Sequence, residues 1–222
     1  MARSAIVSYD GTLNDDDALA LGRMLSVAGV TLSLAYVRHA REHDPRREQR
    51  AADDATRRLE HGAAWLGDPE IERHVVVNPS TSAGLARLAA ASGARLILFG
   101  SEYRTSAGRV APGGSAQGLL EGGAISIGVA QAGVHAQLGA AIATIAVAGE
   151  PGGAAAGTAE SLAVALGARI VAATGDADLI LVDSQSHAAP GRIALGGATR
   201  ARLDAARGSV IVLPRDAPLT FA

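Results

Sequence analysis

Cysteine and lysine are both absent from the 222-residue chain, and all 20 basic residues are arginines. The absence of cysteine excludes disulfides, iron–sulfur clusters, thiolate zinc sites and cysteine nucleophiles. The absence of lysine excludes a G-x-x-x-x-G-K-[ST] phosphate loop, a Schiff-base lysine and the Ser–Lys pattern of some hydrolases. Aromatic residues make up only 3 % of the chain, so the 48 % of hydrophobic residues are mostly small and aliphatic. This composition favours closely packed helices and sheets over a loop-rich fold.

The charge pattern argues against nucleic-acid and membrane partners. The formal net charge is −2, no basic stripe is present, and few aromatic side chains offer a surface for stacking bases. The N-terminus has no signal-peptide pattern. The segment Gly122–Gly149 carries no charged residue, but it is only weakly apolar, and we interpret it as a strand, a linker and a second strand. We therefore expect a soluble, cytoplasmic protein.

Short apolar runs alternate with helix-like segments along the segment 1–139. The run Asn14–Asp17 is interpreted as the cap and acidic first turn of the first helix. Predicted strands are 4–8, 30–37, 71–77, 95–99 and 125–130, and predicted helices are 14–28, 46–66, 80–92 and 115–120. Strands that alternate with helices in this way predict an α/β fold, with an open parallel sheet and helices on both faces.

The alternation starts again at residue 140, which predicts two domains, 1–139 and a shorter 140–222. Predicted strands in the second are 143–148, 168–173, 179–182 and 210–213, and predicted helices are 157–166 and 197–206. Similar residues recur at a single offset of 83, so that Ala94–Leu98 matches Ala177–Leu181 and Gly108–Ala111 matches Gly191–Ala194. The second copy has no counterpart of the charged helix, the third strand and the helix after it, so we interpret it as an abridged repeat.

A glycine-rich loop, Gly100–Ser115, leaves a buried strand and enters a helix. Ligands of open parallel sheets bind at this position, beyond the carboxyl ends of the strands. Gly113 and Gly114 allow backbone N–H groups to approach a ligand, and free amides at a helix start favour an anion. Arg104 or Arg109 would add charge-assisted hydrogen bonds to a phosphate. The alternative is a glycine-rich connection that binds no ligand.

Three segments together resemble the universal stress protein family in its tandem bacterial form. Ile6–Thr12 followed by Asp17–Ala20 resembles the family's first strand, Asp-Gly-Ser turn and first helix, and Leu32–Val37 resembles its second strand. Gly100–Ser115 resembles its G-x-x-G-x9-G-[ST] nucleotide motif, in the variant that contains Gly-Arg-Val. The resemblance implies a five-stranded parallel sheet in the order 3-2-1-4-5 in the first domain.

The resemblance also implies how the two copies pack. In the family the edge fifth strands pair across a two-fold axis, and here Ile125–Ala130 and Val210–Leu213 are the equivalent apolar edges. Leaving these edges unpaired would expose backbone groups. We therefore expect an intrachain pseudo-dimer, and a homodimer of whole chains is the further assembly that the resemblance allows.

The resemblance implies an adenine-nucleotide site in the first domain, for ATP or AMP, with Mg²⁺ only where ATP is bound. Asp10 matches the family's acidic residue near the adenosine, and Val37 matches the end-of-strand residue whose backbone meets adenine. Tyr103 stands where the middle motif glycine is expected, and Gly114 stands where the hydroxyl residue is expected, one position before Ser115. The binding residues implied are Asp10, Val37, Gly100, Tyr103, Arg109, Gly113, Gly114 and Ser115.

The second copy departs further from the motif. Glu150 stands at the Asp10 position, and Asp183 replaces the first motif glycine. An ionised carboxylate there repels phosphate, so we expect the second domain to bind no nucleotide. The function implied for the whole chain is a stress-response module that binds an adenine nucleotide, acts on an unknown protein partner and has at most slow ATPase activity.

Two other interpretations of the same residues stay open. The first is an interaction protein of the same fold that binds no nucleotide. The second is a haloacid-dehalogenase-like phosphatase, because Asp10-Gly11-Thr12 resembles the end of that family's Asp-x-Asp-Gly-Thr signature. Ser8 occupies the position of the nucleophilic aspartate there, and a serine cannot form a phosphoaspartate. His39 and His43 lie in a polar segment that we interpret as a loop rather than as a metal site.

Overall fold

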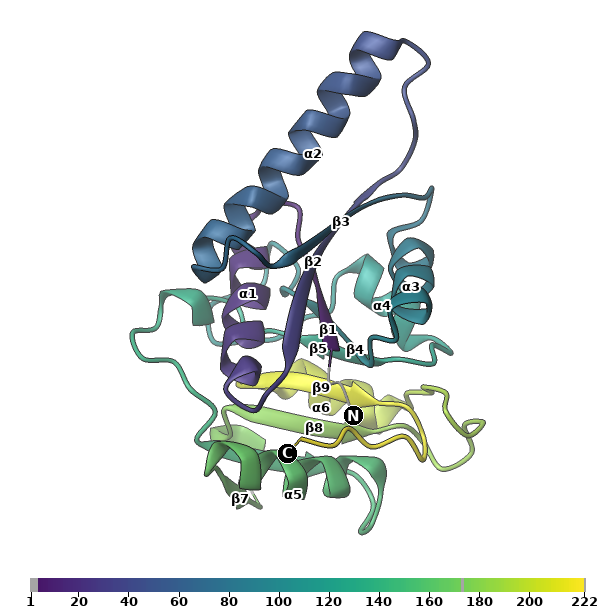
Figure 1. Cartoon of the computed structure of the whole chain (residues 1–222). Helices are drawn as coiled ribbons and strands as arrows, with labels where there is room; N and C mark the ends of the chain where they lie inside the picture. Colours follow the sequence, from purple (N-terminus) through teal and green to yellow (C-terminus); the bar gives the residue numbers. More distant parts are fainter. Residues whose placement is uncertain (1–3, 173, 222) are drawn as a thin grey trace.

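The computed structural model describes residues 4–172 and 174–221. The strands are β1 (Ser4–Ser8), β2 (Thr31–Arg38), β3 (Glu72–Val77), β4 (Leu96–Phe99), β5 (Ser126–Val129), β6 (Thr144–Ala148), β7 (Arg169–Val171), β8 (Leu179–Asp183) and β9 (Ser209–Leu213). The helices are α1 (Leu13–Ser26), α2 (Pro45–Leu66), α3 (Thr81–Ser92), α4 (Gly114–Leu120), α5 (Ala154–Leu166) and α6 (Gly197–Ala205), with short 3-10 helices η1 (Val134–Ala136) and η2 (Thr174–Asp176). These elements form an α/β fold around one continuous sheet (Figure 1).

The sheet is larger than the expected five-stranded sheet of order 3-2-1-4-5. The described strands form one sheet of nine, in the order β3-β2-β1-β4-β5-β9-β8-β6-β7. β5 is therefore not an edge, because β9 pairs with it and continues the sheet toward β7. The β5–β9 pairing is antiparallel, whereas the other described strand pairs are parallel. All described residues of β5 and β9 are buried. If the two strands did not pair, each would expose apolar side chains and unpaired backbone groups that could bind another chain.

Helices cover both faces of the sheet, as the alternation predicts. In β4, Leu96 and Leu98 pack in one apolar cluster, while Ile97 and Phe99 pack in another. This alternation follows from the period of two in a strand, which sends successive side chains to opposite faces. The first cluster includes residues of α1, α2 and α5, and the second includes residues of α3, α4 and α6. Each face thus has its own core, and each core continues across the β5–β9 junction.

Most predicted boundaries agree with the structure within one or two residues, and the start of α5 differs by three. α1 begins at Leu13 with Thr12 as its N-cap, not at Asn14, because the Asp15 carboxylate accepts hydrogen bonds from the Thr12 N–H and hydroxyl. α5 begins at Ala154, earlier than the predicted start at Gly157. The Asp183 carboxylate accepts a hydrogen bond from the Ala155 N–H at 2.7 Å and so caps this earlier turn. The predicted strand 168–173 shortens to β7, and its last residue, Ala173, lies outside the described residues.

The long helix α2 extends beyond the sheet (Figure 1). Its buried residues all lie in its second half, beginning at Ala55. Its first turn is held to the end of β2 by a bidentate ion pair, in which Arg38 Nη1 and Nη2 donate to the two Glu48 carboxylate oxygens at 3.0 and 2.7 Å. This hydrogen bonding with Arg38 lowers the pKa of Glu48 to about 2.

Hydrogen bonds recur at the offset of the sequence repeat. The Ala111 N–H donates to Ser101 Oγ at 3.2 Å, and 83 residues further along the chain the Ala194 N–H donates to Ser184 Oγ at 2.7 Å. In the β5–β9 ladder, Gly128 lies opposite Ile211, which is its equivalent at the same offset. The two strands therefore meet at positions that the sequence repeat makes equivalent.

The uncharged segment Gly122–Gly149 forms β5, η1 and β6, which confirms the strand–linker–strand interpretation. Asp17 of α1, only 1 % exposed, holds this linker. Its carboxylate accepts hydrogen bonds from the Gly133 N–H at 2.8 Å and the His135 N–H at 2.9 Å, and it lies 2.6 Å from His135 Nδ1. In the part of the chain that the structure describes, no helix is both long enough and apolar enough to cross a bilayer.

Replacing Asp17 by alanine tests this anchor. The substitution leaves two partly buried backbone N–H groups without their acceptor, so we expect a loss of about 2–4 kcal/mol in the free energy of unfolding. Urea denaturation followed by circular dichroism measures it. The control is Asp53→Ala, since Asp53 only accepts an exposed hydrogen bond from Gln49. Equal midpoints for the two variants would contradict an anchoring role for Asp17.

Candidate functional site

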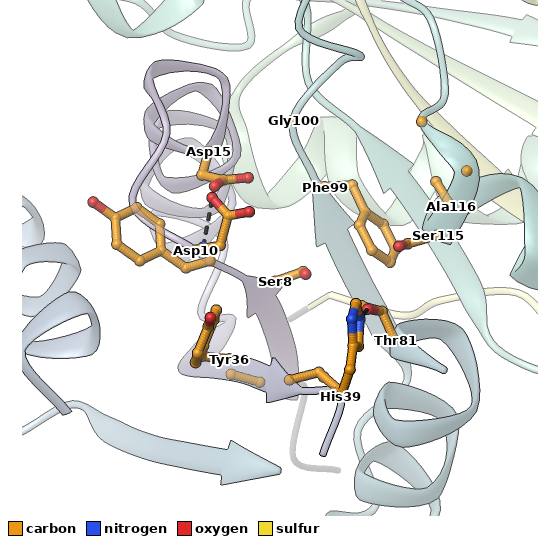
Figure 2. Close-up of a pocket in the computed structure, with 15 residues that line it drawn as sticks. Ser8, Asp10, Asp15, Tyr36, His39, Thr81, Phe99, Gly100, Ser115 and Ala116 are labelled. Atoms are coloured by element: carbon orange, nitrogen blue, oxygen red, sulfur yellow. Dashed lines mark hydrogen bonds between the residues drawn. The ribbon is translucent and has the colours of Figure 1, made fainter. Parts of the chain in front are cut away.

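A cavity of about 310 Å³ opens where β1, β2 and β4 end (Figure 2). Parallel sheets bind ligands at this end of their strands. The volume lies near the lower end of the range for small-molecule sites, about 300–1,000 Å³. The residues that line the cavity are Ser8, Tyr9, Asp10, Asp15, Ala35, Tyr36, Val37, His39, Thr81, Phe99, Gly100, Gly113, Gly114, Ser115 and Ala116.

The structure brings six of the eight residues named from the sequence into this lining: Asp10, Val37, Gly100, Gly113, Gly114 and Ser115. Tyr103 and Arg109 do not belong to it. Tyr103 is 70 % exposed, and the Arg104 guanidinium lies over its ring at 4.9 Å from the centroid. The Arg109 side chain turns toward α6 and donates from Nη1 to the Ala205 carbonyl oxygen at 3.4 Å. The loop path therefore directs both side chains away from the cavity.

Gly100 is required by a close contact between two loops. A Cβ at Gly100 would overlap the backbone carbonyl of Asn14 at the start of α1. The Asn14 side chain also donates from Nδ2 to the Ser101 carbonyl oxygen at 2.7 Å. These contacts hold the β1–α1 turn against the end of β4, and they place Asp10 and Asp15 beside the glycine-rich loop.

Gly113 and Gly114 leave open space at the cavity wall. A Cβ built on either residue meets no atom within 4 Å. The first intrahelical bond of α4 runs from the Gln117 N–H to the Gly113 carbonyl at 2.9 Å, so the amides of Gly114, Ser115 and Ala116 precede the helical ladder. A ligand can therefore approach this backbone closely and bind its amides.

Asp10 and Asp15 form a carboxyl pair on the opposite part of the lining (Figure 2). The Asp15 carboxylate accepts hydrogen bonds from the Asp10 N–H at 3.1 Å, the Thr12 N–H at 3.2 Å and the Thr12 hydroxyl at 2.8 Å. Burial and the neighbouring Asp10 carboxyl raise the pKa of Asp15 to about 8. At neutral pH the pair therefore offers both a protonated carboxyl, which donates, and a carboxylate, which accepts.

The cavity rim is fixed by contacts between elements. His39 Nε2 lies 3.0 Å from Thr81 Oγ1, which joins the end of β2 to the start of α3. Arg58 of α2 donates from Nη1 to the Asp10 carbonyl oxygen at 2.5 Å and pairs through Nε with Asp54 at 2.9 Å. Tyr9 is buried, and its hydroxyl donates to Asp16 Oδ1 at 3.3 Å. Burial and Asp16 raise the pKa of Tyr9 above its usual range, so the ring stays neutral.

Sequence reasoning missed several residues of this lining, above all Asp15 and His39. Asp15 was interpreted as one of the acidic residues that are common in the first turn of a helix, and His39 was interpreted as part of a polar loop. Neither interpretation required a ligand. The sequence positions of Asp15 and His39 could have indicated a role in the site. Each residue follows a predicted strand, 4–8 or 30–37, and residues that follow parallel strands lie at the carboxyl edge of the sheet.

The described residues contain no group of three or more His, Asp or Glu side chains arranged to hold a metal ion. Mg²⁺ commonly binds proteins through one or two carboxylates together with substrate phosphates. Asp10 and Asp15 are carboxyl groups of that kind. A magnesium ion here would need phosphate oxygens from a ligand to complete its coordination.

A second cavity, of about 290 Å³, lies at the ends of β6 and β8, and Asp183 and Gln185 belong to its lining. A Cβ at Gly149 or Gly153 would overlap Asp183 Oδ2, and a Cβ at Gly196 would overlap the Gln185 amide. Burial raises the pKa of Asp183. A carboxyl group thus lies at the start of α5, next to backbone that an incoming anion would have to approach.

The two kinds of glycine make a matched pair of substitutions. Gly100→Ala places a methyl group on the Asn14 carbonyl, and we expect it to lower the free energy of unfolding by about 1–3 kcal/mol or more. Gly113→Ala adds the same methyl group in open space and should change stability by less than about 0.5 kcal/mol. Thermal and urea unfolding of both variants provide the measurement. A Gly100→Ala protein as stable as Gly113→Ala would contradict the close packing of the two loops.

The raised pKa of Asp15 predicts a pH dependence of stability. Between about pH 4 and pH 8 the folded state binds more protons at this carboxyl than the unfolded state. The contribution of Asp15 to the free energy of unfolding therefore falls as the pH rises through this window. In Asp15→Asn this contribution disappears, so its urea midpoint should fall less from pH 5 to pH 9 than that of the original chain. Parallel midpoint curves would show that Asp15 titrates normally.

No family model and no curated protein sequence matches the chain. Solved structures do match it. A universal stress protein from Archaeoglobus fulgidus DSM 4304 superposes with a TM-score of 0.69 at 12 % identity, covering 95 % of this chain and 98 % of that one. A putative universal stress protein from Pseudomonas aeruginosa UCBPP-PA14 gives 0.64 at 15 % identity, over 97 % and 94 % of the two chains. A protein of unknown function from Pseudomonas aeruginosa PAO1 gives 0.61 at 15 % identity, over 97 % and 93 %. The chain therefore has the α/β fold of universal stress protein structures.

Proposed function

We propose that the cavity at the ends of β1, β2 and β4 binds an adenine nucleoside or nucleotide, and that the protein is a ligand-binding stress-response module. The observation that carries the proposal is the pair Gly113 and Gly114, which line the cavity with open space at both Cβ positions. Free amides behind such glycines are suited to ligand oxygens.

The aromatic residues support a ligand with a planar ring. The chain has only six aromatic residues, and Tyr9, Tyr36 and Phe99 all line this cavity. The Tyr9 ring is buried in the core, so Tyr36 and Phe99 are the rings that add an apolar wall of the kind that base-binding sites use. Val37 lies in the same lining, at the end of β2 where the family resemblance positions the adenine edge.

We propose binding rather than catalysis as the main activity. Ser8 takes the place of the nucleophile in the phosphatase interpretation, and it lines the cavity. A hydroxyl there cannot form the phosphoaspartate on which that chemistry depends. Hydrolysis of a bound nucleotide would then be slow and incidental to its binding.

We infer further that residues 140–221 are an abridged copy of residues 4–139, and that the two form an intrachain pseudo-dimer. The support is the common sequence offset, which relates the Ser101 and Ser184 hydrogen bonds and also the paired residues Gly128 and Ile211. In this arrangement the copy closes the sheet edge of the first part. In its own cavity Asp183 and Gln185 lie against the glycine backbone that a phosphate would approach, so one nucleotide is expected per chain.

A second candidate function is an interaction protein that binds no nucleotide. The exposed Tyr103, stacked with Arg104 on the same loop, favours it, because tyrosine and arginine are the residue types that dominate protein–protein contacts. The two functions differ in whether a nucleotide binds at all.

Calorimetric titration with adenosine, AMP and ATP separates these functions. Gly114→Val should lower the affinity at least tenfold, because the branched side chain fills the space beside the α4 amides. The matched control is Gly197→Val. Gly197 is also the first residue of a helix and has open space at its Cβ, but it lies in the second part of the chain. Absence of binding for all three ligands, or equal affinity in the two variants, would contradict the proposed site.

A further inference from the structure

The charge balance of the cavity is unlike that of a polyphosphate site. Two carboxyl groups, Asp10 and Asp15, line it, and among the described lining residues His39 is the one that can carry a positive charge. Sites for phosphate chains usually combine backbone amides with lysine or arginine. The chain has no lysine to place there, and Arg109, the cation that the sequence motif suggested, is bound to the Ala205 carbonyl instead.

The arginines nearest the cavity are also committed elsewhere. Arg58 approaches Asp10 from α2, but it binds the backbone carbonyl of Asp10 and the Asp54 carboxylate. Arg38 is buried at the end of β2 and holds Glu48 with both of its terminal nitrogens. Neither residue belongs to the cavity lining. The charge of Asp10 and Asp15 is therefore not neutralised from inside the cavity.

From this geometry we infer that the cavity selects ligands of low negative charge, so that an uncharged nucleoside binds more tightly than its triphosphate. The inference rests on the proposed function and names the ligand class of that site. Its basis is the make-up of one cavity, whose described lining holds two carboxyl groups, Asp10 and Asp15, and neither lysine nor arginine. The backbone at the start of α1 also packs against Gly100, the first glycine of the loop, where a Cβ would overlap the Asn14 carbonyl. Phosphates bound at Gly113 and Gly114 would therefore share this cavity with both carboxyl groups.

The same pair is well suited to the hydroxyl groups of a ribose. Each ribose hydroxyl both donates and accepts, and a carboxylate beside a protonated carboxyl offers one acceptor and one donor. Burial and Asp10 raise the pKa of Asp15 to about 8, which keeps this combination in place at neutral pH. Above about pH 8 Asp15 becomes negatively charged, and repulsion of a phosphorylated ligand increases. The other titratable or charged groups near the pair are Tyr9, Asp16, His39 and Arg58.

Calorimetry with adenosine, AMP and ATP, in EDTA and then in excess Mg²⁺, tests the inference. In EDTA at pH 7 we expect adenosine to bind about tenfold or more tightly than ATP, with AMP between them. From pH 7 to pH 9 the ratio of the ATP to the adenosine dissociation constant should rise further. In Asp15→Asn this rise should be absent. Asp53→Asn removes the same charge from an exposed position on α2 and should behave like the original chain.

The outcomes separate this inference from the proposed function. If none of the three ligands binds, the nucleotide-binding function itself is wrong. If ATP binds as tightly as adenosine in EDTA, the site exists but does not select against charge. Tighter binding of ATP than adenosine in Mg²⁺ would also overturn the inference, because the carboxyl pair would then act through a bridging metal. Should Asp15→Asn fail to fold, the EDTA affinities and the pH dependence of the original chain decide the matter.

Discussion

Backbone pairing between β5 and β9 is the constraint on which the rest of the architecture depends. It joins strands that are far apart in sequence, and it turns two sets of parallel strands into one sheet with two continuous cores. β9 is the last strand in the described chain, yet it lies in the middle of the sheet. During synthesis, the apolar edge of β5 therefore stays unpaired until β9, about 80 residues later, has emerged. Contacts of such sequence separation form late, and deleting β9 would expose two central edges at once.

The cavity owes its shape to contacts that lie behind it. Asn14 and Gly100 bring the start of α1 against the end of β4 so closely that no side chain fits between them. One result is that Asp10 and Asp15 become neighbours of the glycine-rich loop. Another is that Asp17, two positions further along α1, binds the linker instead of lining the cavity. Three acidic residues that look alike in the sequence thus have different partners in space.

Much of the fold could be predicted from the sequence because its signals are local. Strands such as β4 and β9 are apolar at nearly every position, and the ends of α2 and α3 coincide with glycines in the left-handed region, Gly67 and Gly93. The pairing of β5 with β9 was implied by the family resemblance, and the apolar sequences of both strands agree with it. The site was only partly predictable. The glycines could be found by motif, whereas the directions of Tyr103 and Arg109 depend on the path of a loop and on the packing of α6. Asp15 was missed because a helix N-terminus already explained its charge.

The carboxyl group at the start of α5 has a consequence for how the protein responds to its surroundings. Asp183 acts as an anion that is covalently part of the chain, so the amide it binds is satisfied at every ligand concentration. The amides of Gly114, Ser115 and Ala116 beside the first cavity precede the hydrogen-bond ladder of α4, and any molecule that binds there stabilises the folded state by mass action, by about 2.7 kcal/mol at a concentration of 100 times Kd. The folded chain would then gain stability when a ligand binds beside β1, whereas the Asp183 hydrogen bond contributes the same stability at every ligand concentration. If the proposed ligand binds, the fraction of unfolded chain, and with it the rate of degradation, should fall as the ligand accumulates.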